Sequence, residues 1–298
     1  MKPKITVGVC VKDCEATIKE AIDSILNQDY SHDLMEIIVV DGNSKDKTLE
    51  ILKDCLKNAK IKTKIFQEKG GLGCQRQKVI DNANGEYIVW VDGDMIISKN
   101  YISKIVEFME QHPRVGIAKG RPSIKYKNTL TVLEVMSHYV EKNVDYQSDK
   151  AYSKTLGTGG SVYRTRAIKE AGGFDKSLKY YCEDWDVEIK IRALGWFRII
   201  INNVEYTDYE RYGITWKILW RKYWLRGYYT YQFLRKHPRL VKHYKMFPPA
   251  AFLAGLLYAH KLFKITHKRI VFLLPFHYLF KMTVWYIGFM KSYLNSSR

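Results

Sequence analysis

The sequence predicts an α/β protein whose mostly parallel sheet carries helices on both faces, followed by a helical tail that associates with membranes. Short apolar, β-branched runs alternate with segments of helical periodicity, and polar or glycine-rich loops follow the strands. Residues 211–298 hold 17 basic and no acidic side chains, together with 22 of the 41 aromatic residues. We therefore expect three regions, 1–210, 211–245 and 246–298.

Strands and helices alternate at the start of the chain. The run ITVGVCV at 5–11 is apolar and β-branched, which favours a strand, and apolar residues then recur at helical spacing as far as Leu26. Helices between successive strands act as crossovers, so these strands are expected to be parallel. The same alternation predicts strands at 35–41, 61–67 and 86–92, and helices at 47–58 and 74–84.

The later part of the first region is less regular. Its pattern indicates a helix at 100–111, a strand near 115–120, an amphipathic stretch at 129–145, a glycine-rich loop at 156–163 and a helix at 180–196.

Two carboxylates follow the fourth strand, in the sequence Asp92-Gly93-Asp94. The carboxyl ends of parallel strands form the edge where such sheets bind ligands. Carboxylate oxygens there can hold Mg²⁺ or Mn²⁺, which would bridge the phosphates of a nucleotide. The alternative is a solvated turn with Gly93 at positive φ, since Asp-Gly is common in turns. In either case Gly93 is expected to allow the tight turn.

Five segments in order resemble family-2 glycosyltransferases of the GT-A fold, a Rossmann-like α/β architecture. The resemblance covers roughly residues 4–205. The segments are CVKDCEATIKEAIDSILNQDY, IIVVDGNSKDKT, GGLGCQRQKVIDNANGEYIVWVDGD, GTGGSVYRTRAIKEAGGFD and YYCEDWDVEIKIRALGW.

The resemblance implies a site for a nucleotide-diphosphate sugar, with UDP or GDP as the nucleotide. Asp41 would accept a hydrogen bond from the uracil or guanine ring, and Arg76 would lie near the diphosphate. Asp94 would be the direct ligand of Mn²⁺ or Mg²⁺, and Asp92 would face the ribose or the metal. The implied donor-binding residues are Val11, Asp13, Asp41, Gly71, Arg76, Asp92 and Gly93.

Catalysis is assigned by the same resemblance to the acidic start of the helix at 180–196. Asp184 would be the general base that removes the proton of an acceptor hydroxyl, and Glu183 would orient it or the acceptor. The alternative is that both acids merely complement the dipole of the helix. The implied acceptor-binding residues are Gly159, Gly160, Trp185, Arg221 and Arg226.

Two positions depart from the family pattern. Gln77 stands where many relatives have asparagine, and 197–215 contains no histidine for the metal or the diphosphate. Asp208, Glu205 or water are the candidates for the missing ligand.

The tail combines basic, aromatic and apolar residues. The pattern at 214–240 predicts a helix up to His237, which is either a structural helix or a basic ledge for lipid phosphates. The apolar run at 247–259 is short for a membrane span, and the run at 270–290 is interrupted by Pro275, His277 and Lys281. We expect two amphipathic or re-entrant helices in the cytoplasmic membrane interface, with a transmembrane hairpin or an oligomer interface as alternatives.

Compartment and redox state are indicated by two features. The five cysteines are scattered without metal-binding spacing, which favours reduced thiols in the cytosol. The first residues lack the apolar core of a signal peptide, so export of the folded part is not expected.

These observations together predict an inverting, metal-dependent glycosyltransferase at the cytoplasmic face of the cell membrane. It would use a UDP or GDP sugar, and a polyprenyl phosphate or lipid-linked saccharide as acceptor. One alternative is a nucleotidyltransferase that makes nucleotide sugars, but no glycine-rich basic loop follows the first strand. Another is a nucleic-acid-binding protein, but the basic excess is confined to the apolar tail, so no nucleic-acid partner is expected.

Overall fold

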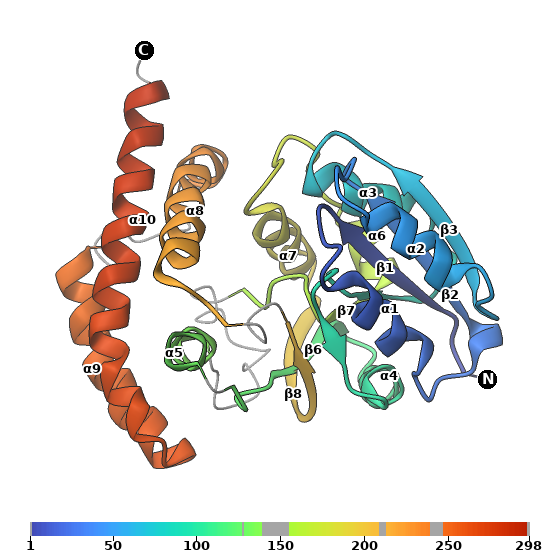
Figure 1. Cartoon of the computed structure of the whole chain (residues 1–298), viewed down its shortest axis with the longest axis horizontal. Coiled ribbons are helices and arrows are strands. Elements are labelled where there is room, and N and C mark those ends of the chain that lie inside the picture. Colours follow the sequence, from blue (N-terminus) through green and yellow to red (C-terminus); the bar gives the residue numbers. More distant parts are fainter. Residues whose placement is uncertain (1, 127, 139–154, 209–212, 239–246, 297–298) are drawn as a thin grey trace. The chain divides into compact units, whose positions relative to one another are not determined.

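The computed structural model of the chain describes residues 2–126, 128–138, 155–208, 213–238 and 247–296 (Figure 1). The chain divides into two compact units, and each is described by itself. The first unit comprises Met1–Pro122 and Lys142–Tyr209, and the second comprises Ser123–Glu141 and Glu210–Arg298. The second unit thus contains both tail regions together with a segment from the middle of the chain.

The first unit is built on one mixed sheet. Its described strands run in the order β3 (Lys62–Gln67), β2 (Met35–Asp41), β1 (Ile5–Val11), β4 (Tyr87–Trp90), β7 (Ser161–Arg164), β6 (Val115–Pro122), β8 (Phe197–Thr207) and β5 (Ile96–Ile97). The pairs β1–β2, β2–β3 and β1–β4 are parallel, as the alternation of strands and helices predicts. Every residue of β1 and β2 is buried, because helices cover both faces.

Helices cover this sheet in two sets. The helices of the first unit are α1 (Ile18–Leu26), the short 3₁₀ helix η1 (His32–Leu34), α2 (Thr48–Leu56), α3 (Leu72–Asn82), α4 (Tyr101–Gln111), α6 (Thr165–Glu170) and α7 (Glu183–Ala193). Val9 of β1 belongs to the core that α1, α2 and α4 share with the sheet. The neighbouring Gly8 faces the other side, where a Cβ would lie 2.8 Å from Val79 of α3. Gly116 likewise faces Ala167 of α6 at 3.2 Å.

The second half of the sheet was not fully predicted. β7 pairs antiparallel with both β4 and β6, whereas β6 and β8 are parallel. The loop expected at 156–163 ends in β7, which begins at Ser161. A strand of four residues is too short to show the alternation of apolar and polar residues that identifies a strand. The glycines that precede it therefore led to the prediction of a loop.

The second unit consists of helices in the residues that the structure describes. They are α5 (Thr129–Ser137), α8 (Trp216–Lys236), α9 (Pro248–Thr266), the 3₁₀ helix η5 (Arg269–Leu273) and α10 (Leu274–Ser296). The predicted helix up to His237 is confirmed as α8. The amphipathic stretch expected at 129–145 forms a helix only as far as Ser137, and positions 139–145 lie outside the described residues.

Glycines allow α8 and α10 to cross closely. A Cβ on Gly227 of α8 would lie 1.9 Å from the carbonyl oxygen of Trp285, and one on Gly288 of α10 would lie 2.1 Å from that of Trp224. No side chain fits at either position, so glycine is needed for this close approach of two backbones. Substitution of either glycine would separate α8 from α10.

The helix expected in the apolar run at 270–290 is present as η5 and α10. Pro275 does not interrupt a helix, because α10 begins at Leu274 and the first turn of a helix needs no amide donor from proline. Among the described residues, Arg269–Ser296 is the one helical segment long and apolar enough to cross a membrane.

Candidate active site

The loops after β1 and β2 are tied together at the carboxyl edge of the sheet. The Asp13 amide donates to Ser44 Oγ at 3.0 Å, and the Lys45 amide donates to Asp13 Oδ1 at 2.8 Å. Asp13 has a φ of +51°, which turns the chain sharply after β1. Asp41 is fully buried and accepts hydrogen bonds from the Ser44 amide and from Gln67 Nε2 at 3.1 Å. Its carboxylate is therefore fixed in orientation.

Asp92 and Asp94 lie in a turn after β4, which the Met95 amide closes by donating to the Asp92 carbonyl at 3.0 Å. Gly93 lies in this turn as expected, but it is not among the residues with positive φ, which the alternative of a solvated turn assumed. Glycine is needed there for space instead, since a Cβ would lie 2.8 Å from Val11 Cγ1. Val11 thus contacts the turn of the two aspartates rather than standing apart from it.

Arg76 of α3 joins the end of β4 to the start of α7. Arg76 is 5% exposed, and its guanidinium hydrogen-bonds to Glu183 Oε1 and lies 3.7 Å from Asp92 Oδ1. Three segments far apart in sequence therefore meet at one cation. Burial raises the pKa of Glu183 to about 7, although the positive charge of Arg76 opposes that shift. Glu183 Oε2 has no hydrogen-bond partner among the described residues.

Glu183 lies in the first turn of α7, where its negative charge complements the helix dipole, and its carboxylate also bonds to Arg76. Asp184 does contact the helix start, because its Oδ1 accepts from the Trp185 amide at 2.9 Å. The first turn of α7 thus carries two carboxylates with different partners.

The glycine-rich loop before β7 lies against two site carboxylates. A Cβ on Gly159 would lie 2.3 Å from Asp92 Oδ2, and one on Gly157 would lie 3.4 Å from Asp184 Oδ2. Gly157 and Gly160 also have φ values of +69° and +74°, which side-chain-bearing residues rarely adopt. The loop backbone therefore occupies the space between the turn that holds Asp92 and Asp94 and the start of α7.

Lys119 of β6 is a site residue that the sequence patterns missed. Its Nζ donates to the Leu156 carbonyl at 2.7 Å, at the start of the glycine-rich loop. Burial lowers the pKa of this ammonium to about 8, while the negative charges of Asp92, Asp208 and Asp184 oppose the shift. The sequence did contain a signal for Lys119, because a charged residue stands within the apolar run VGIAKGRP. The aspartates after β4 were found from a similar signal.

Four further residues were assigned to the site from the sequence, namely Gly71, Trp185, Arg221 and Arg226. Gly71, with a φ of +93°, immediately precedes α3 and packs against the Lys179 carbonyl, so its visible role is to place the helix of Arg76. Trp185 is half-buried on α7. Arg221 and Arg226 belong to the second unit, and their assignment to the acceptor stays a prediction.

The carboxylates fit a divalent ion that is shared with a substrate. Asp92 is 40% exposed and Asp94 half-buried at the same turn, so both are accessible. Within the described ranges, no three His, Cys, Asp or Glu side chains lie close enough together to hold an ion. Mg²⁺ commonly uses one or two carboxylates plus phosphate oxygens and water, so two aspartates suffice. The assignment of Asp208 as a third ligand stays a prediction.

Residues 6–172 match the sequence profile of a family described as "Glycosyl transferase family 2". A relative is the poly-β-1,6-N-acetyl-D-glucosamine synthase of Staphylococcus epidermidis, 23% identical over 64% of this chain and 48% of its own. Another is the poly(ribitol-phosphate) β-N-acetylglucosaminyltransferase TarS of Staphylococcus aureus, 25% identical over 60% of this chain and 32% of its own. The matches thus span about half or less of these relatives.

Solved structures confirm the predicted fold. The mannosyltransferase PcManGT of Pyrobaculum calidifontis, in complex with GDP-Man and Mn²⁺, superposes with a TM-score of 0.69. That likeness covers 99% of this chain and 88% of the other, at 19% identity. S. aureus TarS in complex with UDP-GlcNAc superposes with a TM-score of 0.55 over 98% of this chain and 92% of the other, at 16% identity. At these identities the likeness establishes the GT-A fold.

Proposed function

Because the chain belongs to glycosyl transferase family 2, we propose that it is an inverting glycosyltransferase that moves a sugar from a nucleotide-diphosphate donor to a lipid-linked acceptor. The observation that carries the proposal is the meeting of Asp92, Glu183 and Arg76 at the carboxyl edge of the sheet. Asp184 follows Glu183 directly and lies against the glycine-rich loop. One small region thus holds a cation that can stabilise a diphosphate, Arg76, and a carboxylate that can take the proton of an acceptor, Asp184.

The transfer would proceed by in-line displacement at the anomeric carbon. The acceptor oxygen forms the new bond to that carbon while the bond from carbon to the diphosphate oxygen breaks, which inverts the configuration. Asp184 takes the proton of an acceptor hydroxyl. The negative charge leaves with the nucleoside diphosphate, near Arg76 and Lys119. Burial of Arg76 strengthens its interaction with that charge, because little water screens it.

We assign the donor as a UDP or GDP sugar. PcManGT is described with GDP-Man and Mn²⁺, and TarS with UDP-GlcNAc, so relatives of this fold include both nucleotides. The buried Asp41 is assigned to the hydrogen bond with the uracil or guanine ring of the donor. Asp94, with Asp92, would hold Mn²⁺ or Mg²⁺, whose positive charge would stabilise the leaving diphosphate.

The acceptor is assigned as a polyprenyl phosphate or a lipid-linked saccharide at the cytoplasmic face of the cell membrane. The second unit supports this assignment, because its helices expose apolar side chains and lysines together. Arg221, which is exposed on α8, and Arg226, which is half-buried there, are assigned to the acceptor phosphate.

A thermal-shift screen tests the donor assignment. The unfolding temperature of the full chain would be measured with UDP, GDP and their sugars, each with Mn²⁺, with Mg²⁺ and with EDTA. One nucleotide is expected to raise it only when metal is present, because a ligand that binds the folded state stabilises it. Asp94→Ala should lose the metal-dependent part of the shift. If its shifts equal those of the unchanged chain, the assignment of Asp94 as metal ligand is wrong.

Lys119→Met is expected to weaken binding of the donor nucleotide by about tenfold, because a charge-assisted contact to a phosphate is lost. Isothermal titration with UDP or GDP and Mn²⁺ would measure the affinity. Lys119→Arg keeps the cation and should retain most of the affinity. Lys53→Met, at an exposed position of α2, is the matched control. An unchanged affinity in Lys119→Met would show that Lys119 does not contact the diphosphate.

A further inference from the structure

An apolar face is exposed on α9, η5 and the start of α10. Its large side chains are Leu253, Leu256, Leu257, Phe272, Leu273 and Phe276. Leu257 is 79% exposed and Phe276 is 62% exposed, which is unusual for side chains of this size. Aromatic rings bring the three elements into contact at this face. The rings of Phe252 in α9 and Phe276 in α10 lie 5.5 Å apart, and those of Phe263 in α9 and Phe272 in η5 lie 5.1 Å apart.

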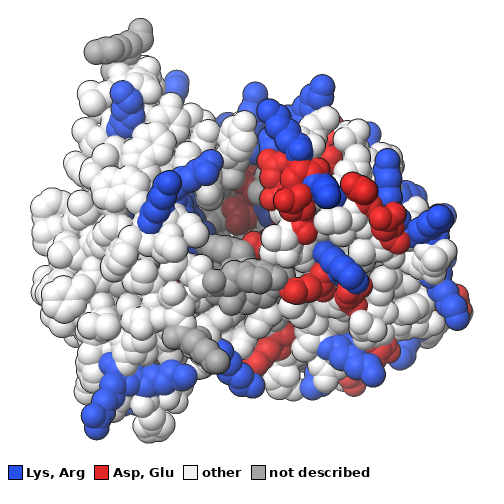
Figure 2. All heavy atoms as spheres, viewed as in Figure 1, with Lys and Arg blue, Asp and Glu red and all other residues white. Residues whose placement is uncertain are grey.

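The charges around this face have one sign. Exposed cations follow at the end of α9 and the start of η5, namely Lys261, Lys264, Lys268 and Arg269. The acidic residue of the second unit that the structure describes is Glu134, and it is buried. On the face of the molecule shown in Figure 2, the helices of this unit display blue and white atoms, while the visible red atoms lie over the first unit. An anionic partner therefore meets attraction where these cations border the apolar face, and no described acidic side chain of this unit is exposed to oppose it.

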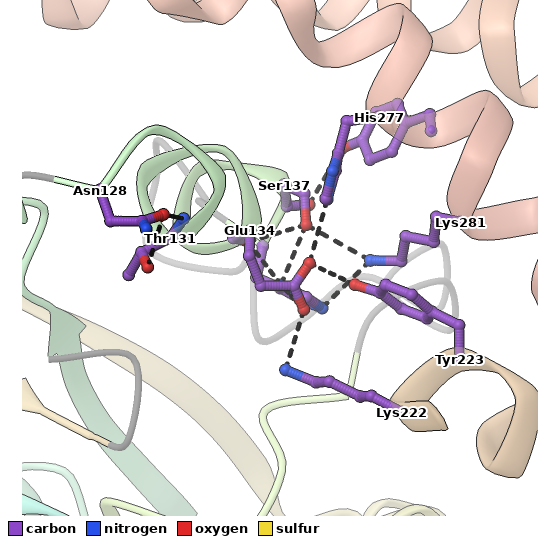
Figure 3. A network of polar contacts seen from close by, with 10 residues as sticks. Asn128, Thr131, Glu134, Ser137, Lys222, Tyr223, His277 and Lys281 are labelled. Atoms are coloured by element: carbon purple, nitrogen blue, oxygen red, sulfur yellow. Dashed lines mark hydrogen bonds and ion pairs between the residues drawn. The ribbon is translucent and has the colours of Figure 1, made fainter. Parts of the chain in front are cut away.

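The opposite face of α10 is tied to Glu134 of α5 by polar side chains (Figure 3). Glu134 Oε2 lies 3.0 Å from His277 Nε2 and accepts a hydrogen bond from the Tyr223 hydroxyl. Lys222 Nζ lies 2.9 Å from Glu134 Oε1. Lys281, one turn beyond His277 on α10, donates to Ser137 Oγ at 3.3 Å. Residues from α5, α8 and α10 thus share one buried carboxylate.

This network decides how α10 can meet a bilayer. His277 and Lys281 lie near the middle of Arg269–Ser296, the segment long enough to span. If α10 spanned the bilayer, His277 and Lys281 would enter the hydrocarbon. Glu134 and Lys222 would then either enter it too, or the buried carboxylate of Glu134 would lose its partners on α10. Both outcomes cost free energy. A helix lying along the surface avoids this cost, because its polar face keeps its partners while its apolar face enters the headgroup region.

We propose that the second unit binds the surface of an anionic lipid bilayer through the exposed face of α9, η5 and α10, and that α10 lies along the bilayer without crossing it. This inference rests on the membrane partner of the proposed function and deepens it, because it names the contacting residues, the lipid charge and the depth. The lysines at the end of α9 and Arg269 would contact the anionic headgroups.

Vesicle co-sedimentation of the full chain tests the contact. Binding is expected to vesicles of phosphatidylcholine with phosphatidylglycerol, and only weakly to phosphatidylcholine alone. Leu257→Glu and Phe276→Glu should each bind about tenfold more weakly, because each replaces an exposed apolar side chain that would be buried in the bilayer. Leu194→Glu makes the same change at an exposed position of the first unit and should bind normally. Circular dichroism and an unchanged unfolding temperature would show that each variant is folded.

Normal vesicle binding by both Leu257→Glu and Phe276→Glu would overturn the proposal. Absence of vesicle binding, with a dimer in solution that Leu257→Glu dissociates, would also overturn it and would assign the face to a second copy of the chain. Donor binding in the thermal-shift screen does not involve this face. Failure of the membrane inference can therefore be told apart from failure of the proposed function.

A labelling experiment tests the depth. Arg269→Cys and Ser296→Cys place thiols at the two ends of the segment, and a membrane-impermeant maleimide is added outside sealed vesicles that carry the protein. Both ends should react equally, after subtraction of the reaction of the unchanged chain and its five cysteines. If one end reacts only after detergent opens the vesicles, α10 crosses the bilayer and this part of the proposal is wrong.

Discussion

Asp184→Asn is expected to lower kcat for transfer to a hydroxyl acceptor by about 10³-fold, because asparagine cannot take the proton that the attacking hydroxyl loses. The shape of the side chain is preserved, and the asparagine oxygen can still accept from the Trp185 amide as Asp184 does. Donor binding should therefore stay close to normal in the thermal-shift assay. Initial rates with the donor found in the screen would measure the effect.

The acceptor decides how this result is interpreted. A polyprenyl phosphate is already ionised near neutral pH, so its transfer rate should be much less sensitive to Asp184→Asn. Asp23→Asn, an exposed position on α1, is the matched control for the same chemical change. Near-normal kcat of Asp184→Asn with a hydroxyl acceptor would rule out Asp184 as the base.

Glu134→Gln is expected to lower the free energy of unfolding by about 3 kcal/mol, because it leaves the cations of α8 and α10 without their buried counter-charge. Lys222 is the closest of them, with a side chain that is 14% exposed and a separation of 2.9 Å. Urea unfolding followed by circular dichroism would measure the loss. A loss below about 1 kcal/mol would show that the network contributes as little as a surface ion pair.

The double variant Glu134→Gln/Lys222→Met gives a sharper test of the same pair. Removing both partners leaves no uncompensated charge between them, so it should be less destabilised than the sum of the two single variants. Strict additivity would indicate that Glu134 and Lys222 do not interact in solution.

The contribution of Glu134 should also depend on pH. Burial by itself would raise the pKa of Glu134, but the positive charges of Lys222 and Lys281 outweigh it and hold the pKa well below its ordinary value. A carboxyl with a lowered folded-state pKa adds stability above its unfolded-state pKa, and that stability is lost as the pH falls toward the folded-state value. The difference in stability between the unchanged chain and Glu134→Gln should therefore be constant near neutral pH and shrink below about pH 4.3.

Much of the first unit could be predicted because its signals are local. The buried parallel strands β1 and β2 are continuous apolar runs, and α1 and α4 show helical periods that arise from one-sided burial. The position of Asp92 and Asp94 at a strand end also follows from sequence order. β7 was missed because four residues have no detectable period, and its strand partners β4 and β6 lie far away in sequence.

The role of Gly93 shows a different limit. Its place in a turn was evident, but the reason for glycine is the nearby Val11 side chain of another strand, not its own backbone angle. Lys119 was missed for a similar reason. A lysine in an apolar strand becomes a site residue only where the fold brings Asp92, Asp184 and Asp208 around it.

The sequence by itself determined the family, the order of the strands and helices along the chain, and the basic, apolar character of the tail, because motifs, periodicity and charge are properties of neighbouring residues. Only the tertiary structure decided what His277 and Lys281 do. In the sequence they are impurities in an apolar run, whereas in the fold they meet Glu134 and Ser137, more than 140 positions earlier in the chain. Buried charges need partners, and a partner that distant is chosen by helix packing rather than by sequence pattern.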